Sequence, residues 1–197
     1  PIQKVRVGII GLGNRGNTLL EMLQYLVENE MAEVIALSDI KVEKVNKAAE
    51  KLAVWQSKKP TLYHKSKIEW EKLAKRDDID LVIIATPWDL HSPMAIYSME
   101  NGKHVGSEVP IASTIEDCWK LIETAERTQK HCMMMENCNY DEEELWVLNM
   151  IQEGVFGDIT HTEGAYLHDL RALMLHETYY EGQWRLHEHA ERNGNFY

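Results

Sequence analysis

Lys4-Val-Arg-Val-Gly-Ile-Ile10 is an apolar run that leads directly into the turn Gly11-Leu-Gly13-Asn14-Arg15-Gly16, and a helical pattern follows over residues 17–27. The run predicts a buried strand, and the turn has the GxGxxG spacing of a dinucleotide-binding fingerprint. Its glycines allow a tight turn and a close approach of the backbone to a pyrophosphate, while the helix N-terminus supplies free N–H groups. We therefore expect Gly11, Gly13 and Gly16 to form the dinucleotide-binding turn of a Rossmann fold.

An acidic residue follows the second apolar run, Glu33-Val-Ile-Ala-Leu-Ser38. This residue, Asp39, lies about 20 residues past the glycines, which is where such folds place the group that binds the adenosine ribose. A carboxylate there accepts a hydrogen bond from a ribose 2′-hydroxyl and repels a 2′-phosphate, so the sequence predicts NAD as the cofactor. A glycine turn in a different α/β domain is the alternative interpretation.

Composition narrows the class of protein. The chain has 197 residues, with 32 acidic and 21 basic residues and a net charge of −11. It has no long basic run, so we expect neither nucleic acid nor an anionic membrane surface as a partner. No apolar stretch approaches the roughly 20 residues of a membrane span, and no signal peptide is visible. Since no such span is present, we expect a soluble protein. The chain opens at Pro1 rather than Met, so this protein could be cytoplasmic or exported after removal of an N-terminal signal.

The three cysteines, Cys118, Cys132 and Cys138, are odd in number and lack CxxC spacing, which argues against a disulfide framework.

Apolar runs alternate with helical patterns through the first two thirds of the chain. Further strands are expected at residues 61–64, 81–85, 103–106 and 132–136. Helices are expected at 41–52, 68–74 and 92–101, and a longer one through Gln129 opened by a capping box from Ser113 to Glu116. This alternation predicts an α/β fold with a doubly wound parallel sheet, and we assign it to a domain of residues 1–136.

The pattern changes beyond that domain. A helix is expected at 141–152, and residues 158–168 alternate like a one-sided antiparallel strand. Residues 171–197 show little periodicity. We expect residues 137–197 to be the first part of an α+β substrate domain that is truncated by the end of this chain, with an antiparallel sheet through which the protein could form a homo-oligomer.

Three segments follow strands of the predicted parallel sheet: Thr86-Pro-Trp-Asp-Leu-His91, Ser107-Glu-Val-Pro110 and Glu136-Asn-Cys-Asn-Tyr140. Ligands of doubly wound sheets bind beyond the carboxyl ends of the strands. These segments are therefore the candidate site.

The motifs GLGNRG, ATPWDLH and GKHVGSEVP together resemble the glucose–fructose oxidoreductase and inositol dehydrogenase (Gfo/Idh/MocA) family. Members of that family usually carry Glu-Lys-Pro where this chain has Glu108-Val109-Pro110, and valine can neither hold a proton nor donate a hydrogen bond. That departure, with ENCNY, the stretch Thr162–Arg171, Trp184-Arg185 and Arg192-Asn-Gly-Asn-Phe-Tyr197, resembles glycoside hydrolase family 109, whose members are NAD-dependent N-acetylgalactosaminidases.

The resemblance implies roles for residues of both domains. It places Asn14 and Arg15 along the pyrophosphate, Trp88, Asp89, Leu90 and His91 around the nicotinamide, Glu108 and Val109 beside its ribose with Asn137 near it, and Tyr166, Arg185 and Tyr197 on the sugar. The family's catalytic His would lie beyond Tyr197, so we expect the catalytic site to be incomplete within these residues.

The implied function is release of terminal N-acetylgalactosamine from a sugar or glycoconjugate. In that chemistry bound NAD⁺ takes a hydride from C3 of the sugar, which acidifies the C2 proton. Loss of that proton eliminates the aglycone, water adds, and the hydride returns to the sugar. A sugar or polyol dehydrogenase and a non-catalytic NAD-binding module are the alternatives, and Val109 counts against the first.

Several candidate residues also have a structural interpretation. Tyr166 could be a packed aromatic residue, Arg185 a surface ion-pair partner and His91 a cap of the following helix. His168-Asp169 and His187-Glu-His189 suggest a metal, with the latter sharing one face of a strand, but spacing provides no third ligand. We expect no metal.

Overall fold

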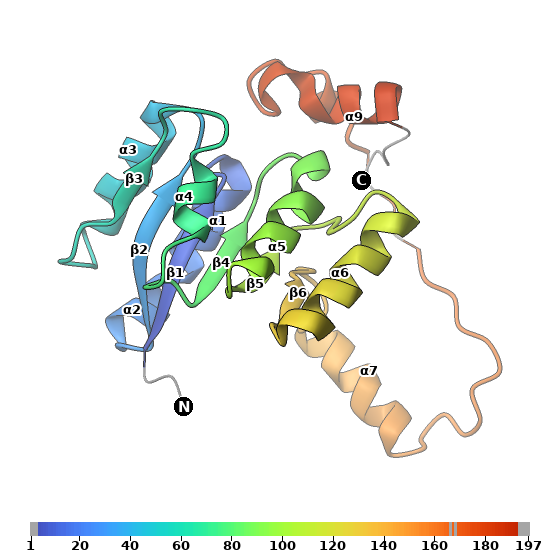
Figure 1. The fold of residues 1–197 in the computed structure, drawn as a ribbon. Helices are drawn as coiled ribbons and strands as arrows, with labels where there is room; N and C mark the ends of the chain where they lie inside the picture. The colour runs from blue at the N-terminus through green and yellow to red at the C-terminus, as the bar shows by residue number, and fades with distance from the viewer. Residues whose placement is uncertain (1–3, 166, 168, 193–197) are drawn as a thin grey trace. The chain divides into compact units, whose positions relative to one another are not determined.

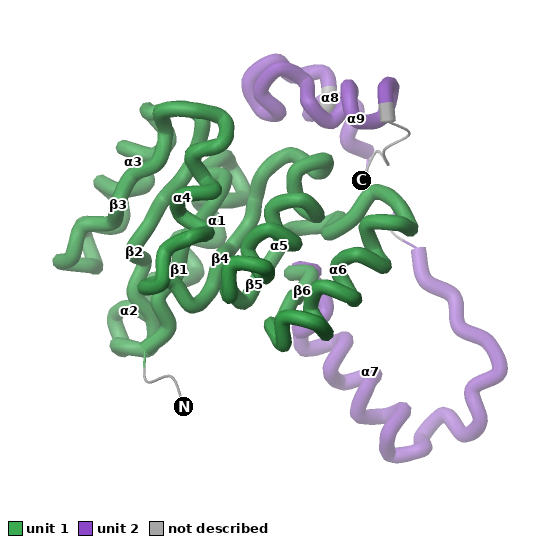
Figure 2. The backbone as a smooth tube through the Cα atoms, in the orientation of Figure 1, with its two compact units in different colours: residues 1–135 green, residues 136–197 purple. Residues whose placement is uncertain are grey.

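The computed structural model describes residues 4–165, 167 and 169–192 of the chain (Figure 1). The chain forms two compact units, residues 1–135 and 136–197 (Figure 2). Each unit is described by itself.

Unit 1 is built on a six-stranded sheet with the order β3-β2-β1-β4-β5-β6, and every pair of neighbouring strands is parallel. The strands are β1 Val5–Ile10, β2 Ala32–Ser38, β3 Thr61–Tyr63, β4 Leu81–Ile84, β5 His104–Ser107 and β6 Cys132–Met134. The order reverses between β1 and β4, which is the switch point where doubly wound folds bind their ligands. The predicted doubly wound α/β fold is confirmed.

Helices cover both faces of this sheet (Figure 1). The apolar side chains of α1 Asn14–Met22, α2 Gln24–Glu28 and α3 Val42–Leu52 pack in one core cluster with β1 and β2. Those of α4 Trp70–Ala74, α5 His91–Glu100 and α6 Ile115–Thr128 pack in the other. Because both faces are covered, the strands consist of continuous apolar runs such as Leu81–Ile84.

Two helices of unit 1 differ from the sequence prediction in ways that bear on local structure. The single helix expected at 17–27 is two helices that meet at Leu23, and the first of them begins at Asn14, inside the glycine motif. The cap of α6 is Thr114 rather than Ser113: its hydroxyl accepts a hydrogen bond from the N–H of Asp117 at 3.1 Å. Thr114 has extended backbone angles that aim its hydroxyl at the first helical turn.

On the edge of β2 that faces β3, a side chain takes the hydrogen-bonding positions that β3 leaves unpaired. The strand β3 pairs only with Ala36–Ser38. Earlier in β2, the amide of buried Gln56 accepts from the N–H of Val34 at 2.8 Å and donates to the oxygen of Val34 at 2.9 Å. It also donates to the oxygen of Lys58 at 2.6 Å. The Gln56 amide thus pairs with Val34 as a neighbouring strand would.

An ion pair joins β1 to the start of β4. The carboxylate of Asp80 accepts hydrogen bonds from the backbone N–H of Arg6 at 2.8 Å and from its Nε and Nη2 atoms at 2.9 and 2.7 Å. These bonds favour the ionised carboxylate, so the Arg6 side chain holds the pKa of Asp80 below its usual value.

Unit 2 contains α7 Glu142–Gln152, α8 Arg171–Met174, the short 3-10 helix η2 Glu181–Gln183 and α9 Trp184–Arg192. The predicted strand at 158–168 is wrong for its described residues, which have neither helical nor strand structure. A strand needs a hydrogen-bonded neighbour, and the described residues of unit 2 include no other strand. His187 and His189 lie on α9 rather than on a strand, and residues two apart on a helix do not share a face.

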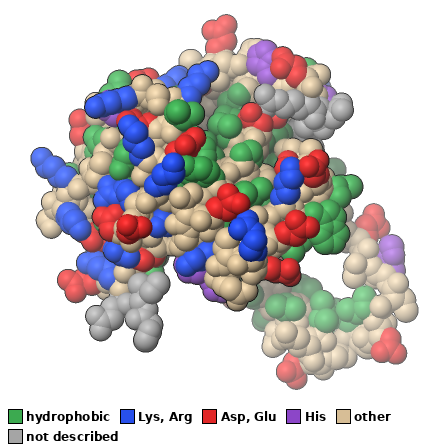
Figure 3. Space-filling model, in the orientation of Figure 1, with side chains coloured by type: hydrophobic (Ala, Val, Ile, Leu, Met, Phe, Trp, Pro, Cys, Tyr) green, Lys and Arg blue, Asp and Glu red, His purple; other side chains and the backbone are tan. Residues whose placement is uncertain are grey.

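The helix α7 exposes apolar side chains along its length, which Figure 3 shows as hydrophobic atoms at the surface. None of its residues is buried, and the exposed ones include Leu145, Trp146, Val147, Leu148 and Ile151. Within the described part of the chain, no helix combines the length and apolar character needed to cross a bilayer.

Candidate functional site

The glycine turn lies at the carboxyl end of β1, and two of its glycines are required by packing. Gly11 has a φ of +89°, and a Cβ there would lie 2.5 Å from the oxygen of Ala85. A Cβ on Gly16 would lie 2.0 Å from the oxygen of Gly11. The absence of side chains at these two positions lets the start of α1 lie close to β1 and β4, as the fingerprint requires.

Gly13 is different, because a Cβ there would make only an ordinary van der Waals contact with the end of a flexible side chain. The nearest described atom outside its chain neighbours is Nζ of Lys44, at 3.8 Å. No packing contact of the protein therefore demands a glycine at this position. A ligand whose pyrophosphate approaches the backbone does demand one, so the turn has the shape that a dinucleotide fits.

Asp39 lies where β2 ends and is fixed against the turn. Its Oδ2 atom accepts a hydrogen bond from the N–H of Leu12 at 2.8 Å, and its Oδ1 atom accepts one from the N–H of Lys41 at 2.9 Å. Each carboxylate oxygen has a second lone pair that can accept a hydroxyl. Asp39 therefore orients the turn and retains the capacity to bind a ribose.

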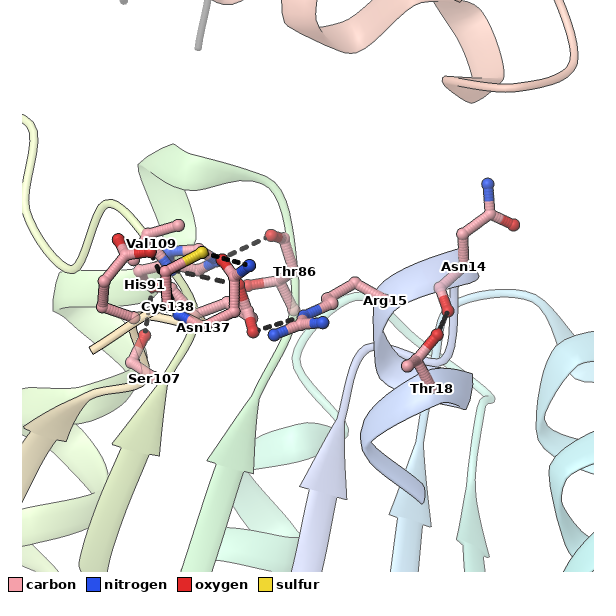
Figure 4. A network of polar contacts seen from close by, with 11 residues as sticks. Asn14, Arg15, Thr18, Thr86, His91, Ser107, Val109, Asn137 and Cys138 are labelled. Carbon is pink, nitrogen blue, oxygen red and sulfur yellow. Dashed lines mark hydrogen bonds and ion pairs between the residues drawn. The ribbon is translucent and has the colours of Figure 1, made fainter. Parts of the chain in front are cut away.

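An ion pair connects the turn to the segment that follows β5. Nε of Arg15 lies 2.6 Å from Oε1 of Glu108, whose side chain is only 10% exposed (Figure 4). Because β4 lies between β1 and β5 in the sheet, this pair spans the switch point. Arg15 and Glu108, both predicted to contact the cofactor, are thus brought together by the fold.

The segment after β4 forms a 3-10 helix, η1 Trp88–Leu90, in which Trp88 is buried while Asp89 and Leu90 are exposed. His91 follows as the first residue of α5 and is 1% exposed. Its Nε2 atom lies 2.7 Å from the oxygen of Thr86, and its Nδ1 atom lies 2.8 Å from the oxygen of Pro110 (Figure 4). Its polar atoms therefore contact protein backbone.

Four of the predicted residues belong to unit 2. Nδ2 of Asn137 lies 3.4 Å from Sγ of Cys138. The guanidinium of Arg185 lies 4.6 Å from the ring centroid of Tyr180 and 5.5 Å from that of Trp184, which are cation–π distances. Tyr166 and Tyr197 lie outside the described residues. The roles assigned to these residues in sugar and cofactor binding stay predictions.

Sequence reasoning missed the backbone contacts of His91 and the pairing of Arg15 with Glu108. The pair joins residues 93 positions apart, and no sequence pattern marks such a contact. As to metals, the described residues contain no group of three His, Cys, Asp or Glu side chains arranged to hold an ion.

Comparison with known families divides the chain in two. Residues 5–136 match the family described as "Oxidoreductase family, NAD-binding Rossmann fold". Residues 140–197 match "Glycosyl hydrolase 109, C-terminal domain".

Curated relatives match over the full chain. A protein from Shewanella sp. strain ANA-3, named glycosyl hydrolase family 109 protein 1, is 48% identical over 196 residues, which is 100% of this chain and 42% of that protein. An alpha-N-acetylgalactosaminidase from Shewanella oneidensis gives the same identity and coverage. The chain thus spans 42% of the length of these relatives.

Solved structures share the fold. The WlbA dehydrogenase from Chromobacterium violaceum, in complex with NADH and UDP-GlcNAcA, has a TM-score of 0.68 and 26% identity, over 79% of this chain and 42% of that chain. An NAD-binding protein from Listeria innocua has a TM-score of 0.63 and 30% identity, over 78% and 42% of the two chains.

Proposed function

Because the chain belongs to the Gfo/Idh/MocA family of NAD-binding Rossmann oxidoreductases, and its residues 140–197 match the C-terminal domain of glycosyl hydrolase family 109, we propose that it is part of an NAD-dependent glycosidase of that family that releases terminal N-acetylgalactosamine. The relative from Shewanella oneidensis bears the name of that activity. The substrate and the reaction are the proposed part, since the chain spans 42% of that relative.

The residues of unit 1 fit an NAD molecule. The uncrowded backbone at Gly13 would accommodate a pyrophosphate, and Asp39 would bind the adenosine ribose. Arg15 carries a positive charge beside the turn, where it would balance the pyrophosphate while Glu108 fixes its orientation.

The bound cofactor supplies a reversible acceptor for the hydride at C3 of the sugar, which makes the neighbouring C2 proton acidic enough for elimination. This chain would position the two ends of that cofactor from different strands. The turn after β1 and Asp39 after β2 would hold the adenosine side, and Glu108 and Val109 after β5 would flank the other side.

The observation that carries the proposal is Val109, next to the Glu108 that pairs with Arg15. An aliphatic side chain can neither accept nor donate a proton, so the position that holds a lysine in dehydrogenases of the family cannot polarise a hydroxyl here. This favours a reaction without net oxidation over a sugar or polyol dehydrogenase.

The test uses the whole proposed glycosidase, of which this chain is a part, and follows both products of a nitrophenyl N-acetylgalactosaminide offered as each anomer. We expect nitrophenol release over many turnovers with no build-up of NADH, and uptake of solvent deuterium at C2 of the sugar. NADH formed in equal amount to consumed sugar would establish a dehydrogenase instead. NAD binding without turnover of either anomer would leave a non-catalytic NAD-binding module. The Gly13→Ala variant is the matched control, since it should remain folded but need a higher NAD⁺ concentration for turnover.

A further inference from the structure

The two ring nitrogens of His91 both face groups that only accept hydrogen bonds. Nε2 lies 2.7 Å from the carbonyl oxygen of Thr86, and Nδ1 lies 2.8 Å from that of Pro110. A neutral imidazole has one N–H, so its other nitrogen would direct a lone pair at an oxygen lone pair at contact distance. Only the imidazolium, which has two N–H groups, makes both contacts favourable.

Other arrangements of the same side chain do worse. Rotating the ring by half a turn would place carbon atoms against both carbonyls and lose both hydrogen bonds. Solvent cannot replace a partner, because the residue is 1% exposed and both distances are those of direct hydrogen bonds.

The two carbonyls belong to the segments that follow β4 and β5, and these two segments are not hydrogen-bonded to each other as strands. The ladder between β4 and β5 ends with the N–H of Glu108 donating to the oxygen of Ile84 at 2.9 Å. Beyond that bond the chain diverges into residues 86–90 on one side and 108–110 on the other. Both segments carry residues that the proposed function places beside the cofactor.

We propose that His91 is a doubly protonated positioning residue whose imidazolium ties Thr86 to Pro110, so that the cofactor-facing segments after β4 and β5 are held as one body. This inference rests on the proposed function only for the identity of the ligand. It corrects the sequence interpretation of His91 as a cap, because its side chain bonds to neighbouring loops and not to the helix it begins.

The local charges act in both directions. His91 begins α5, and the positive end of a helix dipole disfavours a cation there. Two short charge-assisted hydrogen bonds favour it. Asp89 and Glu108 are the acidic residues of the same two segments, and Glu108 is buried. Burial of the ring, which is 1% exposed, also disfavours its charged form. We take the two hydrogen bonds to outweigh both costs, because the neutral ring would leave one carbonyl facing a lone pair.

The decisive measurement is the ¹⁵N chemical shift of both His91 ring nitrogens in the wild-type protein near neutral pH, with and without NAD⁺. The signals are assigned through bonds from the backbone, so no variant is required. We expect both nitrogens in the protonated range. A ¹⁵N chemical shift typical of an unprotonated nitrogen at either ring position would overturn the proposal, whether or not NAD⁺ binds.

The positioning role is tested by NAD⁺ affinity in His91→Gln, which keeps one N–H donor group but no charge. We expect its dissociation constant to rise about tenfold or more, the worth of one charge-assisted hydrogen bond. His131→Gln is the control, since His131 is exposed beside the amino end of β6, and its affinity should match the wild type. Wild-type affinity in His91→Gln would refute the positioning role. Absence of NAD⁺ binding in the wild type would count against the proposed function alone, because the shifts are read independently.

Discussion

Replacing Gly13 by alanine should separate cofactor binding from stability. Gly13 has a φ of −70° and a ψ of −162°, which alanine adopts without strain. Its new methyl group would make only an ordinary van der Waals contact, with Nζ of Lys44 at 3.8 Å as the nearest described atom. We therefore expect the free energy of unfolding to change by no more than about 0.5 kcal/mol, as for a surface substitution.

The effect on the cofactor should be much larger. A methyl group inserted into a close-packed contact costs about 1–3 kcal/mol. Since 1.4 kcal/mol corresponds to a factor of ten, the dissociation constant for NAD⁺ should rise roughly 5- to 150-fold.

The matched variant is Gly16→Ala. Alanine usually stabilises a helix interior by roughly 0.5–1 kcal/mol over glycine. Here its methyl carbon would lie 2.0 Å from the oxygen of Gly11, so that the turn would have to open. We expect a net loss of about 1 kcal/mol or more, because the overlap involves rigid backbone.

Thermal unfolding and calorimetric titration with NAD⁺ measure both quantities on the same samples. The expected result is a Gly13→Ala protein that melts with the wild type and binds NAD⁺ weakly, beside a Gly16→Ala protein that melts early. Wild-type NAD⁺ affinity in Gly13→Ala would refute the placement of the pyrophosphate. Wild-type stability in Gly16→Ala would refute the packing argument.

Three further outcomes follow from single side chains. Asp39→Ala should weaken NAD⁺ binding and reduce the preference of the protein for NAD⁺ over NADP⁺, because the substitution removes the charge that repels a 2′-phosphate. Titrations of both proteins with both cofactors test this, and tighter binding of NADP⁺ than of NAD⁺ by the wild type would contradict the prediction. Thr114→Ala should lower the free energy of unfolding by about 0.5–2 kcal/mol in urea titrations, whereas Ser113→Ala should change it little; equal losses would contradict the cap assignment. In Asp80→Asn, the free energy of unfolding should depend less on pH in the acidic range. The folded pKa of Asp80 lies below its ordinary value of 3.8, so its stabilisation is present above that value and disappears as the pH falls through the folded pKa. Unfolding titrations at several acidic pH values test this, and parallel profiles for the two proteins would contradict it.

The sequence predicts the parts of this protein whose signals are local. The strands β1 and β4 are continuous apolar runs, and the glycine spacing with Asp39 locates the turn. The order β1-β4-β5 depends on the whole sheet, so the contact of Arg15 with Glu108 could not be anticipated from residues 93 apart. The helix α9 was missed because its residues 184–192 are mostly polar, and the strand expected at 158–168 was misread because alternation without a partner strand does not make a ladder.

The Gln56 amide has a consequence for solubility. A strand with unpaired backbone groups is a template on which another chain can grow, and proteins usually protect it with charge, proline or a covering segment. Here one carboxamide occupies both backbone groups of Val34. Gln56→Glu would keep the size of the side chain but replace its donor by a second acceptor, so that the oxygen of Val34 would meet a repelling atom. We therefore expect loss of the amide to leave the backbone groups of Val34 unpaired and to favour intermolecular pairing and aggregation.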